Sequence, residues 1–369
     1  MKARLGEARA LKFGFNGRVS PFRAEGASPL FWSVLGNCGH ARGAASAGDV
    51  AVDPLTDVGR AICNALLPSG SGVLQIDFSV WKYLSCAMPS ETARGAAAYR
   101  AIHQTLEGGA IFKDEFALRI IDDETAARLN EIATDNAERR MRLFIAARSR
   151  FSEDTIANCV ACGVRQVVVL GAGLDTFSLR NPYADLGLRV FEVDHPATQM
   201  WKRDRIRAAG LFEPPSLVFA PIDFERESLR DGLTRAGLNV DAPAFFQWLG
   251  VVPYLTKDAV SSTLKFMCEL PHASVVFDYA EPFQNYPAER RARIMARAER
   301  AAARGEPWLS LFGPAELHEL LRCAGFKVIE DLGASEIAER FYGVLGRDIT
   351  RGPGPHIVRA YHWADQVTG

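Results

Sequence analysis

A strand pattern that runs directly into a glycine turn is the feature of this sequence that most restricts its fold. Residues 167–170 are Val-Val-Val-Leu, and Gly171-Ala-Gly173 follows at once. Glycine lets the backbone turn tightly and lets a ligand approach it closely. In open α/β sheets such a turn lies at the carboxyl end of the first strand, where ligands bind. The segment therefore predicts a nucleoside-type binding site on an α/β fold.

The chain from residue 88 onward alternates between strand and helix patterns. Strands are predicted at 166–170, 189–193, 217–222, 244–249, 274–279, 327–332 and 356–361. Helices are predicted at 90–107 and 123–162, and then at about 174–180, 196–209, 225–236, 256–270 and 314–324. Continuous apolar strands separated by helices indicate a mostly parallel, Rossmann-like sheet with helices on both faces. The helices before the first strand would add an N-terminal helical cover.

The first 87 residues of the 369-residue chain differ from the rest. Their periodicity is poor, and residues 1–42 carry seven basic side chains against two acidic ones. One interpretation is a basic targeting or regulatory extension. The other, which we favour, is a disordered or artefactual extension, with translation starting at Met88. The remaining 282 residues, 88–369, suffice for a single α/β domain.

The composition argues against several classes of partner. A formal net charge of −1 does not favour nucleic acid or an anionic membrane. No apolar run reaches about 18 residues, so no transmembrane helix is expected. Seven irregularly spaced cysteines favour a reducing cytoplasm over a disulfide framework. The lone C-x-x-C pair of Cys159 and Cys162 offers too few ligands for zinc, and we expect no metal site.

An acidic residue follows the second predicted strand at the distance that a nucleoside site requires. Asp194 lies 21 residues after Gly173, which is the spacing at which a carboxylate meets ribose hydroxyls. Asp194 is also a candidate helix N-cap, because His195 and Pro196 suit a first helical turn, and the two roles are compatible. Thr176 stands where a dinucleotide fingerprint has its third glycine, which disfavours NAD.

Three blocks of sequence together resemble a known family. They are VVLGAGLDT at 168–176, FEVDHP at 191–196 and FQWLGVVPYLT at 246–256. These blocks resemble the leucine carboxyl methyltransferase family, and more closely its bacterial branch of O-methyltransferases linked to polyketide-type secondary metabolism. The resemblance covers 88–361 and implies a class I methyltransferase fold that uses S-adenosyl-L-methionine. Residues 88–369 would then form the methyltransferase domain.

The resemblance also implies a set of cofactor-binding residues. They are Arg148, Gly171, Gly173, Asp194, Asp223 and Phe224. Arg148 would pair with the methionine carboxylate, a role for which Arg150 is the rival and which suits the planar guanidinium. The glycines would lie beneath methionine and ribose, Asp194 would hold the ribose, and the last two residues would frame the adenine. The alternative for Asp223 is a cap of a helix beginning near Glu225.

The acceptor side of the site is less defined. Eukaryotic members of the family have an acidic residue where Leu249 stands, so their protein-carboxyl specificity is not carried over. A phenol acceptor gains from a base, whereas a carboxylate needs none. The candidates for a base are His195, Tyr254, Tyr279 and Glu281, and none is assigned as catalytic. The insert 282–311 would either form a wall of the acceptor pocket or carry a surface helix.

The sequence therefore predicts an S-adenosyl-L-methionine-dependent O-methyltransferase in the cytoplasm. Its acceptor would be a small-molecule hydroxyl or carboxylate, with neither nucleic acid nor membrane as partner. Two alternatives are an NAD-dependent oxidoreductase on a Rossmann fold and a non-catalytic nucleoside-binding protein of the same fold.

Overall fold

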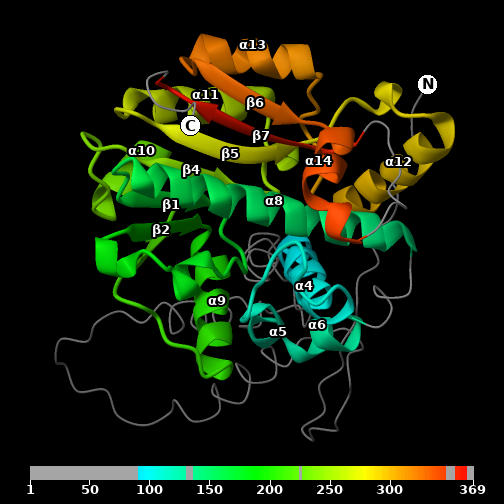
Figure 1. The fold of residues 1–369 in the computed structure, drawn as a ribbon, viewed down its shortest axis with the longest axis horizontal. Helices are drawn as coiled ribbons and strands as arrows, with labels where there is room; N and C mark the ends of the chain where they lie inside the picture. Colours follow the sequence, from blue (N-terminus) through cyan, green and yellow to red (C-terminus); the bar gives the residue numbers. More distant parts are fainter. Residues whose placement is uncertain (1–89, 130–135, 224–226, 346–353, 364–369) are drawn as a thin grey trace, which may run out of the picture. The chain divides into compact units, whose positions relative to one another are not determined.

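A computed structural model describes residues 90–129, 136–223, 227–345 and 354–363 (Figure 1). These residues belong to one compact unit that spans Pro89–Gly369. The predicted extension, residues 1–87, and the predicted adenine contact Phe224 lie outside the described residues. The division of the chain into an extension and one domain therefore stays a prediction.

A seven-stranded sheet forms the centre of the described part of the chain. Its strands are β1 (Gln166–Leu170), β2 (Arg189–Asp194), β3 (Leu217–Pro221), β4 (Phe245–Trp248), β5 (Ser274–Tyr279), β6 (Val328–Leu332) and β7 (His356–Tyr361). They lie in the order β3-β2-β1-β4-β5-β7-β6. The first five pair in parallel, and β7 runs antiparallel to both β5 and β6. The mostly parallel sheet expected from the sequence is confirmed.

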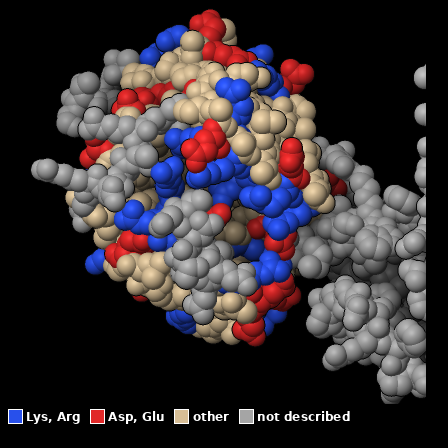
Figure 2. All heavy atoms as spheres, turned by 90° about the vertical axis from the view of Figure 1, so that its right-hand side faces the viewer, with Lys and Arg blue, Asp and Glu red and all other residues tan. Residues whose placement is uncertain are grey.

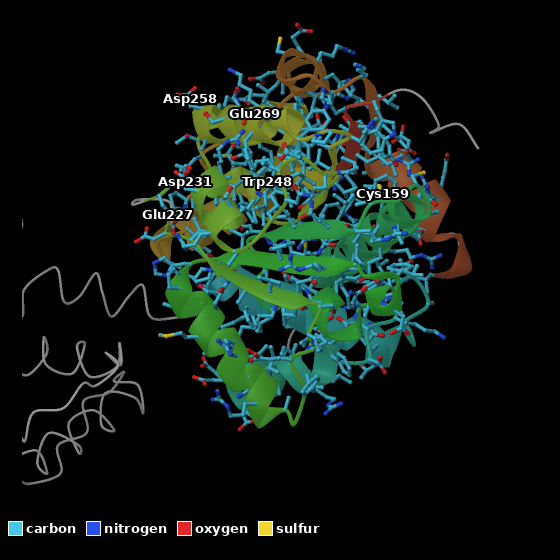
Figure 3. All side chains as sticks on the ribbon, turned by 90° about the vertical axis from the view of Figure 1, so that its left-hand side faces the viewer. Cys159, Glu227, Asp231, Trp248, Asp258 and Glu269 are labelled. Carbon is cyan, nitrogen blue, oxygen red and sulfur yellow. The ribbon has the colours of Figure 1, made fainter. Side chains whose placement is uncertain are left out.

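Helices cover both faces of this sheet. The helices α10 (Leu229–Arg235), α11 (Lys257–Glu269) and α13 (Pro314–Ala324) pack on one face, and α8 (Asn136–Ala161) and α14 (Ala334–Phe341) pack on the other. Because side chains alternate along a strand, Val168 enters the first core and Val167 the second. Burial on both sides explains why residues 167–170 of β1 are all apolar. Figure 3 shows Trp248, almost fully buried at the end of β4, and Cys159 on α8.

A helical layer precedes the sheet in the chain, as expected. It consists of α4 (Glu91–Leu106), α5 (Ala117–Ile120) and α6 (Asp123–Ala127). The Ser90 side chain caps α4 by accepting a hydrogen bond from the backbone N–H of Ala93. Small residues on α4, among them Ala97 and Ala101, share a core with Leu174 and with Ile206 of α9 (Pro196–Ala208). This packing places α4 directly against the turn that follows β1.

The structure differs from the predicted elements in several places. The helix expected at 174–180 is a single 3-10 turn, Phe177–Arg180, because the Asp175 side chain accepts from the N–H of Phe177 and forms a local turn instead. The pattern at 123–162 contains two helices, α6 and α8, with 130–135 outside the described residues. The short helix α14 was not predicted. The insert after β5 carries α12 (Ala288–Ala303), as its pattern indicated.

Candidate cofactor and acceptor site

A cavity of about 500 Å³ lies at the carboxyl ends of β1, β2 and β4. Its floor is the turn 171–175 together with Asp194 and residues 247–251. Its roof is contributed by α4, and Arg148 and Ser149 of α8 form one side. The carboxyl edge of a parallel sheet is where such folds bind their ligands, so the cavity is the candidate cofactor site.

The two glycines of the turn are required by its geometry. Both have positive φ, +63° at Gly171 and +45° at Gly173. A Cβ atom on Gly171 would lie 2.5 Å from Cγ2 of Val251, and one on Gly173 would lie 2.9 Å from the Cβ of Ala93. The backbone therefore fits between β4 and α4 only without a side chain, and it forms an open cradle on the cavity side.

Asp194 holds this turn from the end of the neighbouring strand. Its Oδ2 accepts from the N–H of Gly173 at 2.7 Å, and its Oδ1 accepts from the N–H of His195 at 2.7 Å. Burial raises the pKa of Asp194, while the two backbone donors oppose that rise. Each carboxylate oxygen can accept a second hydrogen bond, and Asp194 lines the cavity. A ribose hydroxyl has a partner there.

The suggestion that Asp194 caps the following helix is wrong. The N-cap of α9 is His195, whose Nδ1 accepts from the N–H of Ala197 at 3.3 Å. Both oxygens of Asp194 point back to the turn and to its own neighbour instead. The imidazole of His195 therefore has a structural role at the start of α9.

The structure distinguishes between Arg148 and Arg150, the two candidates for pairing with the carboxylate of the cofactor. Arg148 is buried, lines the cavity and donates from Nη1 to Oδ2 of Asp278 at 2.8 Å. Its Nε is buried and has no hydrogen-bond partner among the described residues. Arg150 is exposed and pairs with Asp154, four residues along the same helix. Of these two arginines, Arg148 lines the cavity and Arg150 does not.

Of the two predicted adenine contacts, only Asp223 belongs to the described residues. Asp223 follows β3 but is not one of the described side chains that line the cavity. The described helix in this region, α10, begins at Leu229 and is capped by Ser228, while residues 224–226 lie outside the described ranges, so a cap at Asp223 stays a prediction. The Ser228 hydroxyl accepts from the N–H of Asp231 at 3.1 Å.

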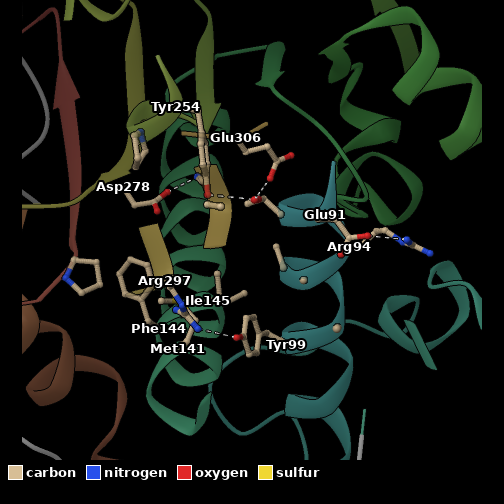
Figure 4. Close-up of a pocket in the computed structure, with 18 of the residues that line it drawn as sticks. Glu91, Arg94, Tyr99, Met141, Phe144, Ile145, Tyr254, Asp278, Arg297 and Glu306 are labelled. Carbon is tan, nitrogen blue, oxygen red and sulfur yellow. Dashed lines mark hydrogen bonds and ion pairs between the residues drawn. The ribbon is translucent and has the colours of Figure 1, made fainter. Parts of the chain in front are cut away.

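A second cavity of about 490 Å³ adjoins the first (Figure 4). It extends between α4 and α8 and is bounded by α12 and by the loop that follows α12. The residues that line both cavities are Thr92, Ala96, Arg148, Gly250, Tyr254 and Glu306. The insert 282–311 therefore does contribute a wall of this cavity, although α12 also presents an exposed face.

A hydrogen-bonded group marks the junction of the two cavities. The Thr92 hydroxyl donates to Oε2 of Glu306 at 2.5 Å and lies 3.3 Å from the Tyr254 hydroxyl. Burial raises the pKa of Tyr254, so its phenol keeps its proton at neutral pH and can donate. Glu306 and Thr92 were missed by sequence reasoning, because they are 214 residues apart and neither belongs to a local motif.

The other candidate bases are engaged elsewhere. Tyr279 lines the second cavity, but its hydroxyl donates to Asp331 at 2.6 Å, and burial raises its pKa. Glu281 lies 3.1 Å from Nε2 of His356.

Of the two cysteines in the C-x-x-C pair, Cys159 is buried 3.3 Å from the hydroxyl of Ser274, and burial raises its pKa to about 11.

A Rossmann-like sheet with a glycine turn and a carboxylate at the ends of β1 and β2 defines a nucleoside-binding α/β protein. Comparison with known proteins gives its family. The family model "Leucine carboxyl methyltransferase" matches residues 93–268. The "Putative S-adenosyl-L-methionine-dependent methyltransferase YktD" of Bacillus subtilis is 33% identical over 278 residues, which are 69% of this chain and 91% of YktD. The chain belongs to the leucine carboxyl methyltransferase family and is an S-adenosyl-L-methionine-dependent methyltransferase.

Other known proteins are also similar to this chain. SCO7813 of Streptomyces coelicolor, which carries the same description, is 33% identical over 181 residues, covering 47% of this chain and 62% of that protein. Among solved structures, a DUF574 family protein from Streptomyces avermitilis has 16% identity and a TM-score of 0.47, with 75% of this chain and 98% of that chain covered. Magnesium protoporphyrin IX methyltransferase from Synechocystis has 14% identity and a TM-score of 0.39, with 68% and 100% covered.

The family assignment decides between the cofactors that the sequence left open. It supports S-adenosyl-L-methionine and leaves no support for the NAD-dependent or non-catalytic alternatives. The cavity fits such a cofactor, since it offers a bare glycine backbone, the carboxylate of Asp194 and the buried guanidinium of Arg148. Among the helices of the described ranges, none is long and apolar enough to cross a bilayer.

Proposed function

We propose that this protein transfers the methyl group of S-adenosyl-L-methionine to an oxygen atom of a small molecule, either a hydroxyl or a carboxylate, in secondary metabolism. The observation that carries the proposal is the second cavity, which meets the candidate cofactor cavity at Thr92, Tyr254 and Glu306. Its volume of about 490 Å³ suits a small molecule rather than a folded partner.

The proposed roles of the cofactor-binding residues follow from their positions. The cradle of Gly171 and Gly173 lies beneath the methionine and ribose, and Asp194 accepts from the ribose hydroxyls. Arg148 binds the methionine carboxylate through donors that Asp278 leaves free. Asp223 and Phe224 stay proposed contacts to the adenine, on the basis of the family resemblance alone.

At the junction, the residues of this chain would orient the acceptor and handle its proton. When bound, S-adenosyl-L-methionine supplies a methyl group already activated by its positive sulfur. The remaining work is alignment of the acceptor oxygen in a site shielded from water. Tyr254 can donate a hydrogen bond that fixes this oxygen, and the Glu306 carboxylate is the nearby group that can take the proton of a hydroxyl acceptor. A carboxylate acceptor has no proton to lose and would need only the hydrogen bond from Tyr254.

An activity screen tests the proposal. Purified protein is incubated with methyl-labelled cofactor and matched sets of phenolic, carboxylic, amine and thiol metabolites, and label in the products is counted. We expect methylated phenols or carboxylic acids, with Tyr254→Phe lowering kcat/KM at least about tenfold. Label found only in amines or thiols would contradict O-methylation.

We also propose a cytoplasmic location and an activity that involves neither nucleic acid nor a membrane. The near-neutral net charge of −1 and the irregular spacing of the seven cysteines support this part of the proposal. Fractionation of cells that produce the protein tests it, and recovery in the membrane pellet would contradict it.

A further inference from the structure

One wall of the second cavity is basic. Helix α12 contributes Arg297 and Arg300, and Arg304 follows at its C-cap. Residues three and four apart lie on the same side of a helix, so the three guanidinium groups form a row along this wall. Figure 2 shows basic side chains gathered in the middle of the face on which α12 lies.

Most arginines of the cavity are neutralised by carboxylates, but two are not. Arg94 and Arg128 pair with Glu124, at 2.8 and 2.9 Å. In the same cavity, Arg148 pairs with Asp278 at 2.8 Å, and Arg297 pairs with Glu138 at 2.9 Å.

The guanidinium groups of Arg300 and Arg304 form no ion pair or hydrogen bond with any residue in the described ranges. Two positive charges therefore face the cavity without a carboxylate partner. Both arginines are exposed, so an anion can reach their guanidinium groups from solvent.

These two arginines line the second cavity and are not among the described residues that line the first. The second cavity also has aromatic side chains in its walls, among them Tyr99, Phe144 and Trp308, the last stacked on Phe283 at 6.2 Å between ring centroids. An acceptor in this cavity therefore meets both aromatic rings and unpaired guanidinium groups, and the same cavity extends to the junction with the first.

We propose that the acceptor is an aromatic hydroxy acid, bound through its carboxylate by Arg300 and Arg304 and methylated on its hydroxyl at the junction. This inference rests on the proposed O-methyltransfer and names its substrate class. In the reaction the hydroxyl oxygen forms a bond to the methyl carbon as the carbon–sulfur bond breaks, and the hydroxyl proton passes to Glu306. The carboxylate is bound and stays unmethylated, so the product is an ether and remains an acid.

Binding measurements test the carboxylate site without relying on catalysis. Phenolic acids with one, two or three rings are each compared with their neutral amides, in protein loaded with S-adenosyl-L-homocysteine, by calorimetry at low salt. We expect at least one acid to bind about tenfold more tightly than its amide, because a charge-assisted pair with arginine is stronger than a neutral contact. Higher salt should reduce this preference, since the site is open to solvent. No acid binding more tightly than its amide overturns the inference.

A double variant with a matched control identifies the residues responsible. Arg300→Gln with Arg304→Gln should bring the acid and amide affinities within about twofold of each other. Arg293→Gln is the control, because Arg293 lies on the same helix, pairs with Glu289 and does not line the cavity. Equal melting temperatures for the variants would show that the fold is intact. An unchanged preference in the double variant overturns the inference.

Methyl transfer is then measured on the same compounds and separates this inference from the proposed function. Products that resist alkaline hydrolysis are ethers, as expected, whereas methyl esters would overturn the placement of the carboxylate. Acid and amide acceptors methylated with equal kcat/KM would overturn the inference and leave O-methylation standing. Acid-selective binding without any O-methyl product would contradict the proposed function and leave the carboxylate site standing.

Discussion

At the scale of single residues, both oxygens of Asp194 already accept a backbone N–H, each at 2.7 Å. Asp194→Ala removes these bonds and the proposed ribose contact, so cofactor affinity should fall at least about tenfold. Asp194→Asn should lower the affinity by a similar factor. Its NH₂ group is a donor and would face one of the two backbone N–H donors, so one of the two hydrogen bonds would be lost. Isothermal titration with S-adenosyl-L-methionine measures both.

The control for Asp194 is Asp204→Asn on the exposed side of α9, which pairs only with Arg207 and should leave affinity unchanged. If both Asp194 variants kept their affinity within about twofold, Asp194 would not be part of the cofactor site.

The close approach at Gly171 gives a second prediction at this scale. Gly171→Ala adds a Cβ that would lie 2.5 Å from Val251 in a residue with positive φ. Gly187→Ala is the matched control, because Gly187 also has positive φ but nothing within 4 Å of such a Cβ. We expect the control to lose roughly 1 kcal/mol of unfolding free energy from backbone strain, and Gly171→Ala to lose clearly more. Urea denaturation compares them, and equal losses would show that the contact with Val251 is unimportant.

The sequence predicts the residues of the site that belong to local motifs. Gly171, Gly173 and Asp194 could be found because a strand end, a turn and a fixed spacing lie within one short stretch. Thr92 and Glu306 could not, since only the packing of α4 against the loop after α12 brings them together. The N-cap of α9 was suggested at Asp194, but it is His195. Both side chains carry hydrogen-bond acceptors, and the direction of the backbone decides which of them reaches the first turn of the helix.

At the scale of elements, the contact between β6 and β7 contains a half-buried histidine, His356, between two carboxylates. Nδ1 of His356 lies 2.9 Å from Asp331 and Nε2 lies 3.1 Å from Glu281, with the Tyr279 ring stacked on the imidazole. Burial alone would lower the pKa of His356, but the two carboxylates raise it above its usual value. Asp331 also accepts from His318, and its pKa is lowered despite its burial.

This arrangement predicts a pH-dependent stability. Because the folded-state pKa of His356 is raised, its contribution is fully present below the unfolded value of about 6.5 and is lost as the pH rises through the folded value. The melting temperature should therefore fall from pH 6 upward, and His356→Gln should flatten this part of the profile. His362→Gln is the control, since His362 has no ion pair within the described ranges. A profile unchanged in His356→Gln would contradict the prediction.

Helices and strands were predicted well where the hydrophobic residues follow one period over a long segment. All seven strands and the longer helices after β1 lie close to their expected positions. For the central strands β1, β4 and β5 the reason is burial on both faces of the sheet, which demands nearly continuous apolar runs. The 3-10 turn at Phe177–Arg180 and the short α14 have too few residues to show a period, and side-chain contacts of Asp175 decide the first of them.

At the scale of the whole molecule, the compact unit begins at Pro89. We therefore expect a truncated protein that starts at Met88 to fold and to bind S-adenosyl-L-methionine with the affinity of the full chain. Calorimetric melting and titration of both proteins check this. A large loss of melting temperature on truncation would mean that residues 1–87 are part of the folded core.

The hydrogen bond between Thr92 and Glu306 has a consequence for the timing of turnover. It joins the first turn of α4 to the loop after α12 where the two cavities meet. Separation of these segments must break a bond to a carboxylate, which contributes about 1.5–3 kcal/mol. The residence time of the spent cofactor should therefore depend on this bond. We expect Thr92→Val to raise the dissociation rate of S-adenosyl-L-homocysteine about tenfold in stopped-flow measurements, and an unchanged rate would mean that the product leaves without passing between α4 and this loop.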